Sequence, residues 1–179
     1  MEKQLNSQLI YDGRVIKVTK DEVLCENGTT SYRECVKAPG GVAILAIKDH
    51  AILLVRQYRY VVSEETIEIP AGKIEPNEDL AVCASRELEE ETGYKAEEMI
   101  RRFTFYPTPG FCGEVLHIYE AKNLTKVEHP KAMDEDECIN SYFLDLDEAY
   151  QQVMNGTIRD SKTIIAIQYA IQAYNKISD

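Results

Sequence analysis

Residues 72–94 read GKIEPNEDLAVCASRELEEETGY. At about 100° per residue, Leu80, Ala84 and Leu88 fall on one stripe of a helix, and this spacing predicts that the stripe is buried. The polar residues around the stripe are mostly glutamates. The stretch therefore predicts a helix that packs one face against the rest of the protein while carrying a high density of negative charge.

The predicted helix spans residues 78–92. Asn77 is placed to cap its N-terminus, and Gly93 is placed to end it in a left-handed conformation. Glu78 at the first helical position would complement the helix dipole.

Several of the acids lie beside the apolar stripe. Glu87 and Glu91 project next to the buried residues, whereas Glu89 is predicted to face water. Carboxylates at the margin of a buried face are unfavourable without cations, and Glu87, Glu90 and Glu91 are spaced closely enough to share them. Oxygen ligands suit a hard ion such as Mg²⁺ or Mn²⁺, which also accepts substrate phosphates as ligands. A solvated, glutamate-rich helix is the alternative, but the facing of the acids favours a phosphate-handling metal site.

The segments on either side indicate an α/β protein. Asp12-Gly13 and Asn27-Gly28 are hairpin signals, and they predict a small antiparallel sheet within residues 1–38. Pro39-Gly40-Gly41 is a plausible boundary, so that a second domain would span residues 39–179. Strands mixed with separated helices indicate a layered α/β domain. The strands are expected at 9–11, 15–18, 23–25, 31–36, 42–47, 52–60, 66–69, 102–106, 115–120 and 139–144. Two further helices are expected at 147–155 and 161–176. The second of them has an apolar stripe of Ile164, Ile167, Ile171 and Tyr174.

Composition narrows the class of function. The chain has 179 residues and a net charge of −11, which opposes binding to nucleic acid or to an anionic membrane. The sequence lacks an apolar run long enough to cross a bilayer and begins without a signal peptide, which predicts a cytoplasmic protein. The five cysteines form no CxxC pair, so neither a disulfide framework nor a zinc knuckle is indicated.

The quoted stretch resembles the Nudix box, G-x5-E-x7-R-E-U-x-E-E-x-G-U. Gly72 and Glu78 occupy the first two fixed positions, residues 86–93 read RELEEETG, and Tyr94 stands where the last aliphatic residue usually lies. The resemblance implies a Nudix-type α/β/α sandwich with a small N-terminal antiparallel sheet, acting as an enzyme on a nucleoside diphosphate linked to another group.

The resemblance also implies residue roles around Mg²⁺, with Mn²⁺ as a possible substitute. Glu87 and Glu91 would be the main metal ligands, with Glu90 close behind as ligand and catalytic residue, and Ala71 would offer its backbone carbonyl. Glu78 and Arg86 would be structural partners within the motif.

Two further segments resemble the ADP-ribose pyrophosphatase subgroup. Pro109 lies fifteen residues after the end of the box within Thr108-Pro109-Gly110-Phe111, although an ordinary Pro-Gly turn is the alternative. The acidic run 134–137 precedes a predicted strand, and it would supply Glu135 as general base and Glu137 as a metal-linked carboxylate. A solvated acidic loop is the alternative for this run. The subgroup's reaction would convert ADP-ribose to AMP and ribose 5-phosphate.

Arginines near the predicted strands are candidates for phosphate contacts, because a guanidinium can bind two phosphate oxygens at once. Arg59 and Arg33 align best with substrate contacts of the subgroup. The complete set of predicted substrate-binding residues is Arg14, Arg33, Glu34, Arg56, Arg59, Thr108, Pro109, Gly110 and Glu114.

Similar enzymes form homodimers in which the N-terminal sheet of one chain completes the adenine site of the other. Arg14 would stand here where several relatives place an aromatic residue, and its planar face could stack on the base. A different nucleoside diphosphate sugar, such as GDP-mannose, and a catalytically silent module that senses such a metabolite are the alternative functions.

Overall fold

The computed structural model describes residues 1–130 and 139–174. Within them the chain forms two compact units. The first contains Met1–Gly40 together with Phe105–Leu116, and the second contains Gly41–Thr104 and the chain from His117 onward. The division into functional domains at residue 38 stays a prediction.

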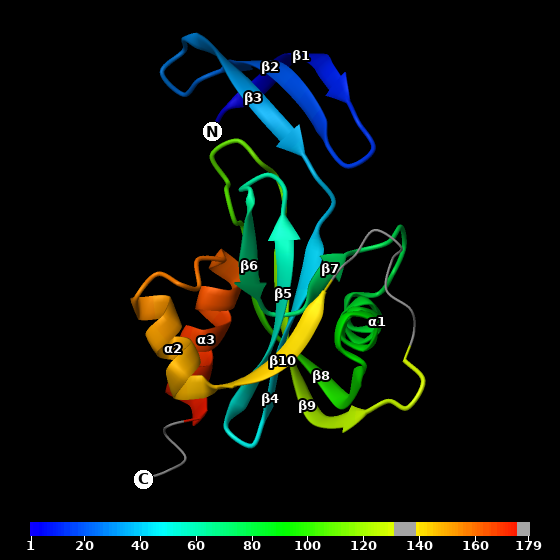
Figure 1. Cartoon of the computed structure of the whole chain (residues 1–179). Coiled ribbons are helices and arrows are strands. Elements are labelled where there is room, and N and C mark those ends of the chain that lie inside the picture. Colours follow the sequence, from blue (N-terminus) through cyan, green and yellow to red (C-terminus); the bar gives the residue numbers. More distant parts are fainter. Residues whose placement is uncertain (131–138, 175–179) are drawn as a thin grey trace. The chain divides into compact units, whose positions relative to one another are not determined.

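The first unit is built on a three-stranded antiparallel sheet in the order β1-β2-β3 (Figure 1). Its strands are β1 (Lys3–Asp12), β2 (Lys17–Leu24) and β3 (Thr30–Lys37). The two segments expected at 15–18 and 23–25 belong to one continuous strand, β2. Gly28 has a φ of 80°, which explains why glycine follows Asn27 in the turn between β2 and β3.

A distant segment of the chain joins this sheet. The Val36 N–H donates to the Phe111 carbonyl at 2.8 Å, and the Val36 carbonyl accepts from the Gly113 N–H at 2.9 Å. These two bonds form a parallel bridge between Val36 and Cys112. The segment 105–116 is therefore held to β3 by backbone hydrogen bonds.

The second unit is a sheet with helices on both faces (Figure 1). Its main path runs β10-β5-β4-β9-β8, with β6 paired to β5 and β7 paired to β4. In Figure 1, α1 covers one face and α2 and α3 cover the other, which is the predicted α/β/α sandwich. The elements are β4 (Gly41–Lys48), β5 (Ala51–Arg59), β6 (Glu64–Glu68), β7 (Ala71–Lys73), α1 (Leu80–Thr92), β8 (Tyr94–Phe105), β9 (Leu116–Lys126), β10 (Asn140–Asp145), α2 (Leu146–Met154) and α3 (Ser161–Tyr174).

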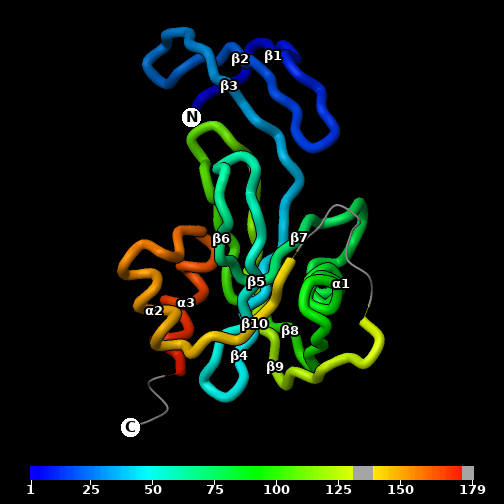
Figure 2. Tube along the Cα trace, viewed as in Figure 1, coloured from blue at the N-terminus to red at the C-terminus, as the bar shows by residue number. Residues whose placement is uncertain are grey.

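The connection from β5 to β7 prepares the site described below. β5 and β6 form a hairpin, which Figure 2 shows as a tight reversal of the chain. Its turn is closed by the Arg59 carbonyl, which accepts from the N–H groups of Val62 and Ser63 at 3.1 and 2.9 Å. Only two residues then separate β6 from β7, so the end of the hairpin and the first residues of the Nudix-like stretch are positioned together.

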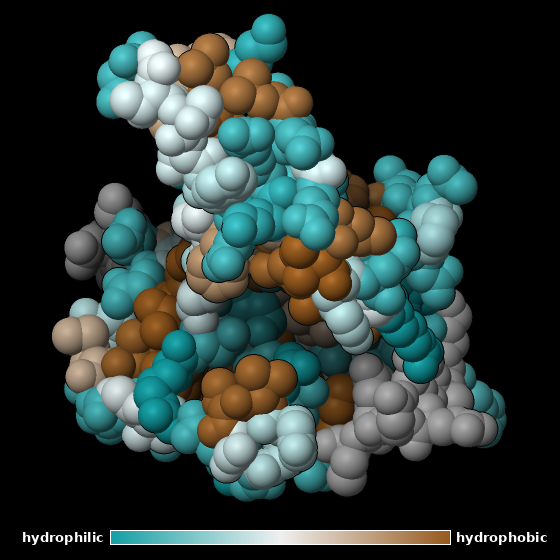
Figure 3. All heavy atoms as spheres, turned by 90° about the horizontal axis from the view of Figure 1, so that it is seen from above, coloured by the Kyte–Doolittle hydropathy of each residue, from teal (hydrophilic) through white to brown (hydrophobic). Residues whose placement is uncertain are grey.

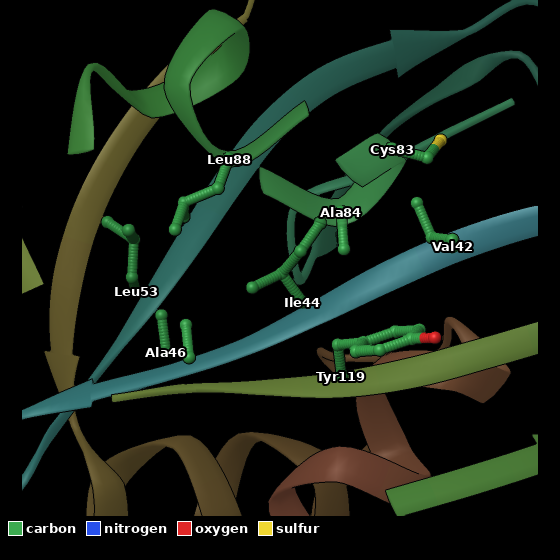
Figure 4. Packing of buried hydrophobic residues seen from close by; sticks show 9 residues of the cluster. Val42, Ile44, Ala46, Leu53, Cys83, Ala84, Leu88 and Tyr119 are labelled. Carbon is green, nitrogen blue, oxygen red and sulfur yellow. The ribbon is translucent and has the colours of Figure 1, made fainter. Parts of the chain in front are cut away.

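The core between α1 and the sheet confirms the predicted apolar stripe at Ala84 and Leu88, whereas Leu80 is half-buried and packs against this core. Ala84 and Leu88 are fully buried, and they face Val42, Ile44 and Ala46 on β4 (Figure 4). The packing fixes the rotation of α1 about its axis. The polar residues next to Leu88 are therefore held at the edge of the sheet.

The expected N-cap of α1 was wrong. Asp79 is the cap, and its carboxylate accepts from the N–H groups of Ala81 and Val82 at 2.9 and 3.2 Å. Asn77 lies before the helix with a φ of 66°. Glu78 is not helical, because its carboxylate accepts from Arg86 and from the Glu75 N–H instead. The predicted left-handed end at Gly93 is confirmed by a φ of 68°.

The expected exposure of Glu89 was also wrong. Glu89 is buried, and its carboxylate lies 3.2 Å from the ammonium group of Lys95. The reason is that β8 begins at Tyr94, directly after the helix, and brings Lys95 back beside α1. Helical periodicity alone does not report such a local return of the chain.

Helix α3 packs through smaller residues than the sequence predicted. Of the expected stripe, Ile167 is fully buried, whereas Ile164, Ile171 and Tyr174 are only half-buried. The other residues of the buried face are Lys162, Thr163, Ala166 and Ala170. Thr163 and Lys162 bury polar groups, which requires polar partners inside the fold.

The main partner of Lys162 is Glu68, at the end of β6. Its carboxylate accepts two hydrogen bonds of 2.7 Å from Arg59, one of 2.6 Å from the Thr66 hydroxyl and one from the Lys162 ammonium group. Burial alone would raise the pKa of Glu68, but hydrogen bonds from Arg59 and the charge of Lys162 outweigh it and lower this pKa to about 2.

A second buried glutamate, Glu120, binds the other end of α3. The Glu120 carboxylate on β9 accepts a 2.6 Å hydrogen bond from Arg102 and further hydrogen bonds from Lys122 and the Tyr174 hydroxyl. Burial opposes ionisation here as well, yet the bonds from Lys122 and Tyr174 lower the pKa of Glu120. Both ends of α3 are thus tied to the sheet by an ionised, buried glutamate.

The surface mixes polar and apolar groups. On the face seen in Figure 3, brown hydrophobic patches are interrupted by teal hydrophilic ones. Within residues 1–130 and 139–174, no helix is long and apolar enough to cross a membrane.

Glu68→Gln should destabilise the protein at neutral pH and flatten its response to acid. Because the folded pKa is depressed, ionised Glu68 stabilises the fold above its ordinary pKa of 4.5, and this contribution disappears as the pH falls toward about 2. At roughly 1.4 kcal/mol per pKa unit, the loss is about 3 kcal/mol. Urea unfolding should show a difference between wild type and variant that is largest near neutral pH and shrinks in acid. A difference that stays constant with pH would contradict this assignment.

Candidate active site

The centre of the candidate site is the contact between α1 and β7. A Cβ atom built on Gly72 would lie 1.8 to 2.2 Å from the carboxylate atoms of Glu87. Real Cβ atoms do not come this close to a neighbour, so only glycine allows the Glu87 carboxylate to rest against the β7 backbone. This contact gives a physical reason for the glycine six residues before Glu78.

Glu91 is held by the same strand. Its Oε2 atom accepts a hydrogen bond of 2.9 Å from the Ala71 N–H, and its side chain is buried. Glu87 and Glu91 lie one helical turn apart on α1. The structure therefore brings both carboxylates to consecutive residues of β7, Ala71 and Gly72.

Arg86 connects the remaining acids of the helix. Its guanidinium donates to Glu87 Oε1 at 2.8 Å, to Glu90 Oε2 at 2.9 Å and to both oxygens of Glu78 at 2.8 and 3.0 Å. It also donates to the Lys73 carbonyl at 3.2 Å. The hydrogen bond from Arg86 lowers the pKa of Glu78 to about 2, and the same bond raises the pKa of Arg86. The predicted structural pairing of Glu78 with Arg86 is present.

The ligand atoms available at the site are of the type that a hard divalent cation prefers. Glu87, Glu90 and Glu91 supply carboxylate oxygens, and β7 supplies backbone carbonyls beside them, which is the chemistry that Mg²⁺ and Mn²⁺ prefer. Across the two described ranges, no group of three or more His, Cys, Asp or Glu side chains is already arranged around a metal position. Arg86 bridges Glu87 and Glu90 in this arrangement, so binding a cation there requires these carboxylates to adjust.

The two predicted arginines of β5 differ in their surroundings. Arg59 is bound to Glu68 through its Nε and Nη2 atoms. Its pKa is raised mainly by that hydrogen bond, and the negative charges of Glu91 and Asp160 add to the effect. Arg56 is exposed and lies over the Tyr142 ring at 5.8 Å. The charge of one α1 carboxylate, Glu91, thus acts on Arg59.

The other predicted substrate-binding residues belong to the first unit. Arg14 and Glu34 are exposed, whereas Arg33 is paired with Glu2, which raises the pKa of Arg33. The Thr108 carbonyl accepts from the Cys112 N–H at 3.0 Å and so closes the turn that contains Pro109 and Gly110. Glu114 is half-buried.

Glu135 and Glu137 lie outside the described residues, so their predicted roles as base and metal-linked carboxylate stay predictions.

Sequence reasoning missed the cluster around Glu68. The available signal was Lys162, which stands four residues before Ala166 and eight before Ala170 on the apolar face of α3. A lysine on such a face needs a buried acidic partner. Its partner could not be identified, because Glu68 and Lys162 are 94 residues apart.

Known proteins resemble this chain over most of its length. The sequence model of the NUDIX domain family matches residues 37–166. A methanol dehydrogenase activator from Bacillus methanolicus is 47% identical over 169 residues, which are 94% of this chain and 91% of that protein. An ADP-ribose pyrophosphatase from Bacillus subtilis (strain 168) is 40% identical with the same coverage. A GDP-mannose pyrophosphatase from Escherichia coli O1:K1 is 28% identical over 86% of this chain and 94% of that protein.

A solved structure supports the fold. The crystal structure described as an ADP compounds hydrolase superposes with a TM-score of 0.86, covering 99% of this chain and 95% of that one at 20% sequence identity. At this identity the likeness concerns the fold alone.

Gly72→Ala should weaken divalent metal binding by about 10- to 100-fold, because the new methyl group displaces the Glu87 carboxylate. Titration with Mn²⁺ followed by electron paramagnetic resonance measures the affinity. Gly113→Ala is the matched control, since a Cβ there meets only the Val36 carbonyl at 3.8 Å. Circular dichroism should show that both variants remain folded. Unchanged Mn²⁺ affinity in folded Gly72→Ala would contradict the role of the Gly72 contact in placing Glu87 as a ligand.

Proposed function

We propose that this chain, which belongs to the Nudix hydrolase family, hydrolyses the diphosphate of ADP-ribose to AMP and ribose 5-phosphate. It is an enzyme similar to ADP-ribose pyrophosphatases. The observation that supports the proposal most directly is the pair of buried carboxylates, Glu87 and Glu91, held at Gly72 and Ala71. Such a pair on a rigid helix and strand is suited to recruit a cation that neutralises a diphosphate.

The proposed metal ligands are Glu87, Glu90, Glu91 and the Ala71 carbonyl, with Mg²⁺ as the expected ion and Mn²⁺ as a substitute. A divalent ion bound there would polarise a phosphoryl oxygen and lower the pKa of a bound water. Arg86 positions Glu87 and Glu90 through its Nη1 atom. Because Arg86 is itself held by Glu78, Glu87 and Glu90 share one support.

The chain's other residues would bind the substrate and move the proton. Arg59 and Arg56 would contact the diphosphate oxygens. Glu135 would take a proton from the attacking water, and Glu137 would bind near the metal. As the water oxygen bonds to phosphorus, the bond from that phosphorus to the bridging oxygen breaks and a phosphate monoester leaves.

The first unit is proposed to contribute to recognition of the rest of the substrate. Its candidate residues are Arg14, Arg33, Glu34, Thr108, Pro109, Gly110 and Glu114. A homodimer and a cytoplasmic location complete this proposal. The free thiols of Cys25, Cys35, Cys83 and Cys112 fit a reducing compartment.

A second candidate function is the activation of a dehydrogenase. It is favoured by the 47% identity to the methanol dehydrogenase activator. GDP-mannose is the alternative substrate, supported by the relative that is named for its hydrolysis. A silent sensor of such metabolites is the third alternative, and the presence of Glu87, Glu90 and Glu91 argues against it.

A substrate panel with Mg²⁺ separates these functions. Phosphorus-31 NMR should show faster release of AMP from ADP-ribose than turnover of GDP-mannose, NADH, diadenosine polyphosphates or nucleoside triphosphates. Faster cleavage of GDP-mannose would show that GDP-mannose, and not ADP-ribose, is the preferred substrate. No turnover of any compound would favour the sensor function. Addition of the protein to a methanol dehydrogenase assay tests the activator function separately.

Glu91→Gln should lower kcat for ADP-ribose by at least about 1,000-fold, because the buried carboxylate that binds the cation becomes neutral. The Ala71 N–H can still donate to the new side-chain carbonyl, so the melting temperature should change little. Glu98→Gln is the matched control, since Glu98 is exposed on β8. Near-normal turnover by Glu91→Gln would exclude it as a metal ligand.

A further inference from the structure

The Arg59 guanidinium is held on one side by a fork to a buried carboxylate. Its Nε atom donates to Glu68 Oε1 and its Nη2 atom donates to Glu68 Oε2, both at 2.7 Å. A guanidinium has five N–H donors in one plane, and this fork uses two of them. Three donors, on Nη1 and on the outer side of Nη2, therefore point away from Glu68.

The outer side of Arg59 is suited to an anionic ligand. Its side chain is 45% exposed, whereas that of Glu68 is 3% exposed, so the fork has a buried base and an accessible end. The negative charge of Glu91, on α1, also acts on the Arg59 guanidinium. A planar pair of donors at such an end binds two phosphate oxygens at once.

The Glu68 carboxylate is also bound by a residue of α3. Lys162 donates to Glu68 Oε2, the oxygen that also receives Arg59 Nη2. Lys162 is itself buried and lies 3.0 Å from Asp160 Oδ1. Two carboxylates thus hold the ammonium group in one position, so Lys162 lacks the conformational freedom of an exposed lysine.

The same part of α3 also fixes the backbone that leads to the candidate site. The Thr163 hydroxyl donates to Asp160 Oδ2 at 2.6 Å and accepts from the Ile69 N–H at 2.8 Å. Ile69 follows Glu68 and precedes, by two residues, the Ala71 N–H that binds Glu91. The start of α3 therefore supports both Arg59 and the strand that holds the metal-binding carboxylates.

We propose that Lys162 is a positioning residue, which fixes the Glu68 carboxylate and thereby orients the outer side of Arg59 toward the substrate's diphosphate. Without Lys162, Glu68 would keep Arg59 as its nearest cation and would draw the whole guanidinium inward. Loss of one partner of a buried ion pair also leaves an uncompensated charge. The outer N–H donors of Arg59 would then be displaced and less available to the diphosphate.

This inference rests on the proposed function, and a double-mutant cycle of Lys162→Met and Arg59→Gln tests it. In the wild-type background Lys162→Met should raise KM for ADP-ribose about 10-fold while kcat changes less than about 2-fold. In the Arg59→Gln background the same change should alter KM less than about 2-fold, because the residue through which Lys162 acts is gone. A general loss of folded protein would lower the apparent kcat instead.

Lys122→Met is the matched control, because Lys122 also binds a buried glutamate that is shared with an arginine. Its cluster adjoins Tyr174, about 18 Å along α3 from Lys162 at 1.5 Å per residue. Lys122→Met should lower the melting temperature comparably and leave KM unchanged. An equal rise in KM would mean that any damage to α3 weakens binding, and it would overturn the proposal.

Two further measurements keep the outcomes separate. If Lys162→Met does not fold, Thr66→Val removes one hydrogen bond from Glu68 Oε1 and should raise KM about 2- to 3-fold, again only when Arg59 is present. Isothermal calorimetry with ADP-ribose in the absence of divalent metal measures binding affinity through the same double-mutant cycle, without turnover. Coupled effects on binding without any hydrolysis would contradict the proposed function alone. Additive effects in an enzyme that hydrolyses ADP-ribose would contradict the role of Lys162 alone.

Discussion

The candidate site depends on how closely α1 approaches β7. The Glu87 carboxylate occupies the space that a side chain at position 72 would need, so the carboxylate can lie in this position only beside glycine. Fully buried Ala84 and Leu88 press the helix onto β4, and they leave it no freedom to rotate the acids away. Packing energy from apolar side chains is thereby used to hold carboxylates where they repel one another. Arg86 makes this tolerable, because one rigid guanidinium binds Glu78, Glu87 and Glu90 together.

The two helical layers contribute to the site in different ways. Helix α1 presents its acids directly, whereas α3, on the other face of the sheet, acts through Glu68 (Figure 1). The buried clusters at its two ends have almost the same composition, with a glutamate, an arginine, a lysine and a hydroxyl group. The cluster at Glu120 fixes the end of the helix to β9, but the cluster at Glu68 adjoins the strand that continues into the site. Similar chemistry can therefore serve anchoring alone at one end of a helix and orientation of a functional group at the other.

The sequence predicts most of the fold and the identity of the acidic helix, because these depend on local periodicity and on turn residues. The apolar stripe of Leu80, Ala84 and Leu88 and the end at Gly93 are of this kind. The N-cap at Asp79 and the burial of Glu89 are not, since they depend on where Arg86 and Lys95 lie after folding. The pairing of Glu68 with Lys162 is the hardest feature to predict from the sequence, because the two residues are 94 positions apart. The only sign of it in the sequence is a lysine on an apolar helix face.

The overall charge of the chain makes the organisation of its cations important. A protein with a net charge of −11 repels a diphosphate at long range, and the carboxylates of α1 add to that repulsion at short range. In the proposed function, attraction comes from a few cations at fixed positions, namely a metal ion held by the acids and an arginine that faces outward. An arginine in such a field would collapse onto the nearest carboxylate. By giving Arg59 a buried partner that is already held by Lys162, the fold satisfies one side of the guanidinium and keeps the other available.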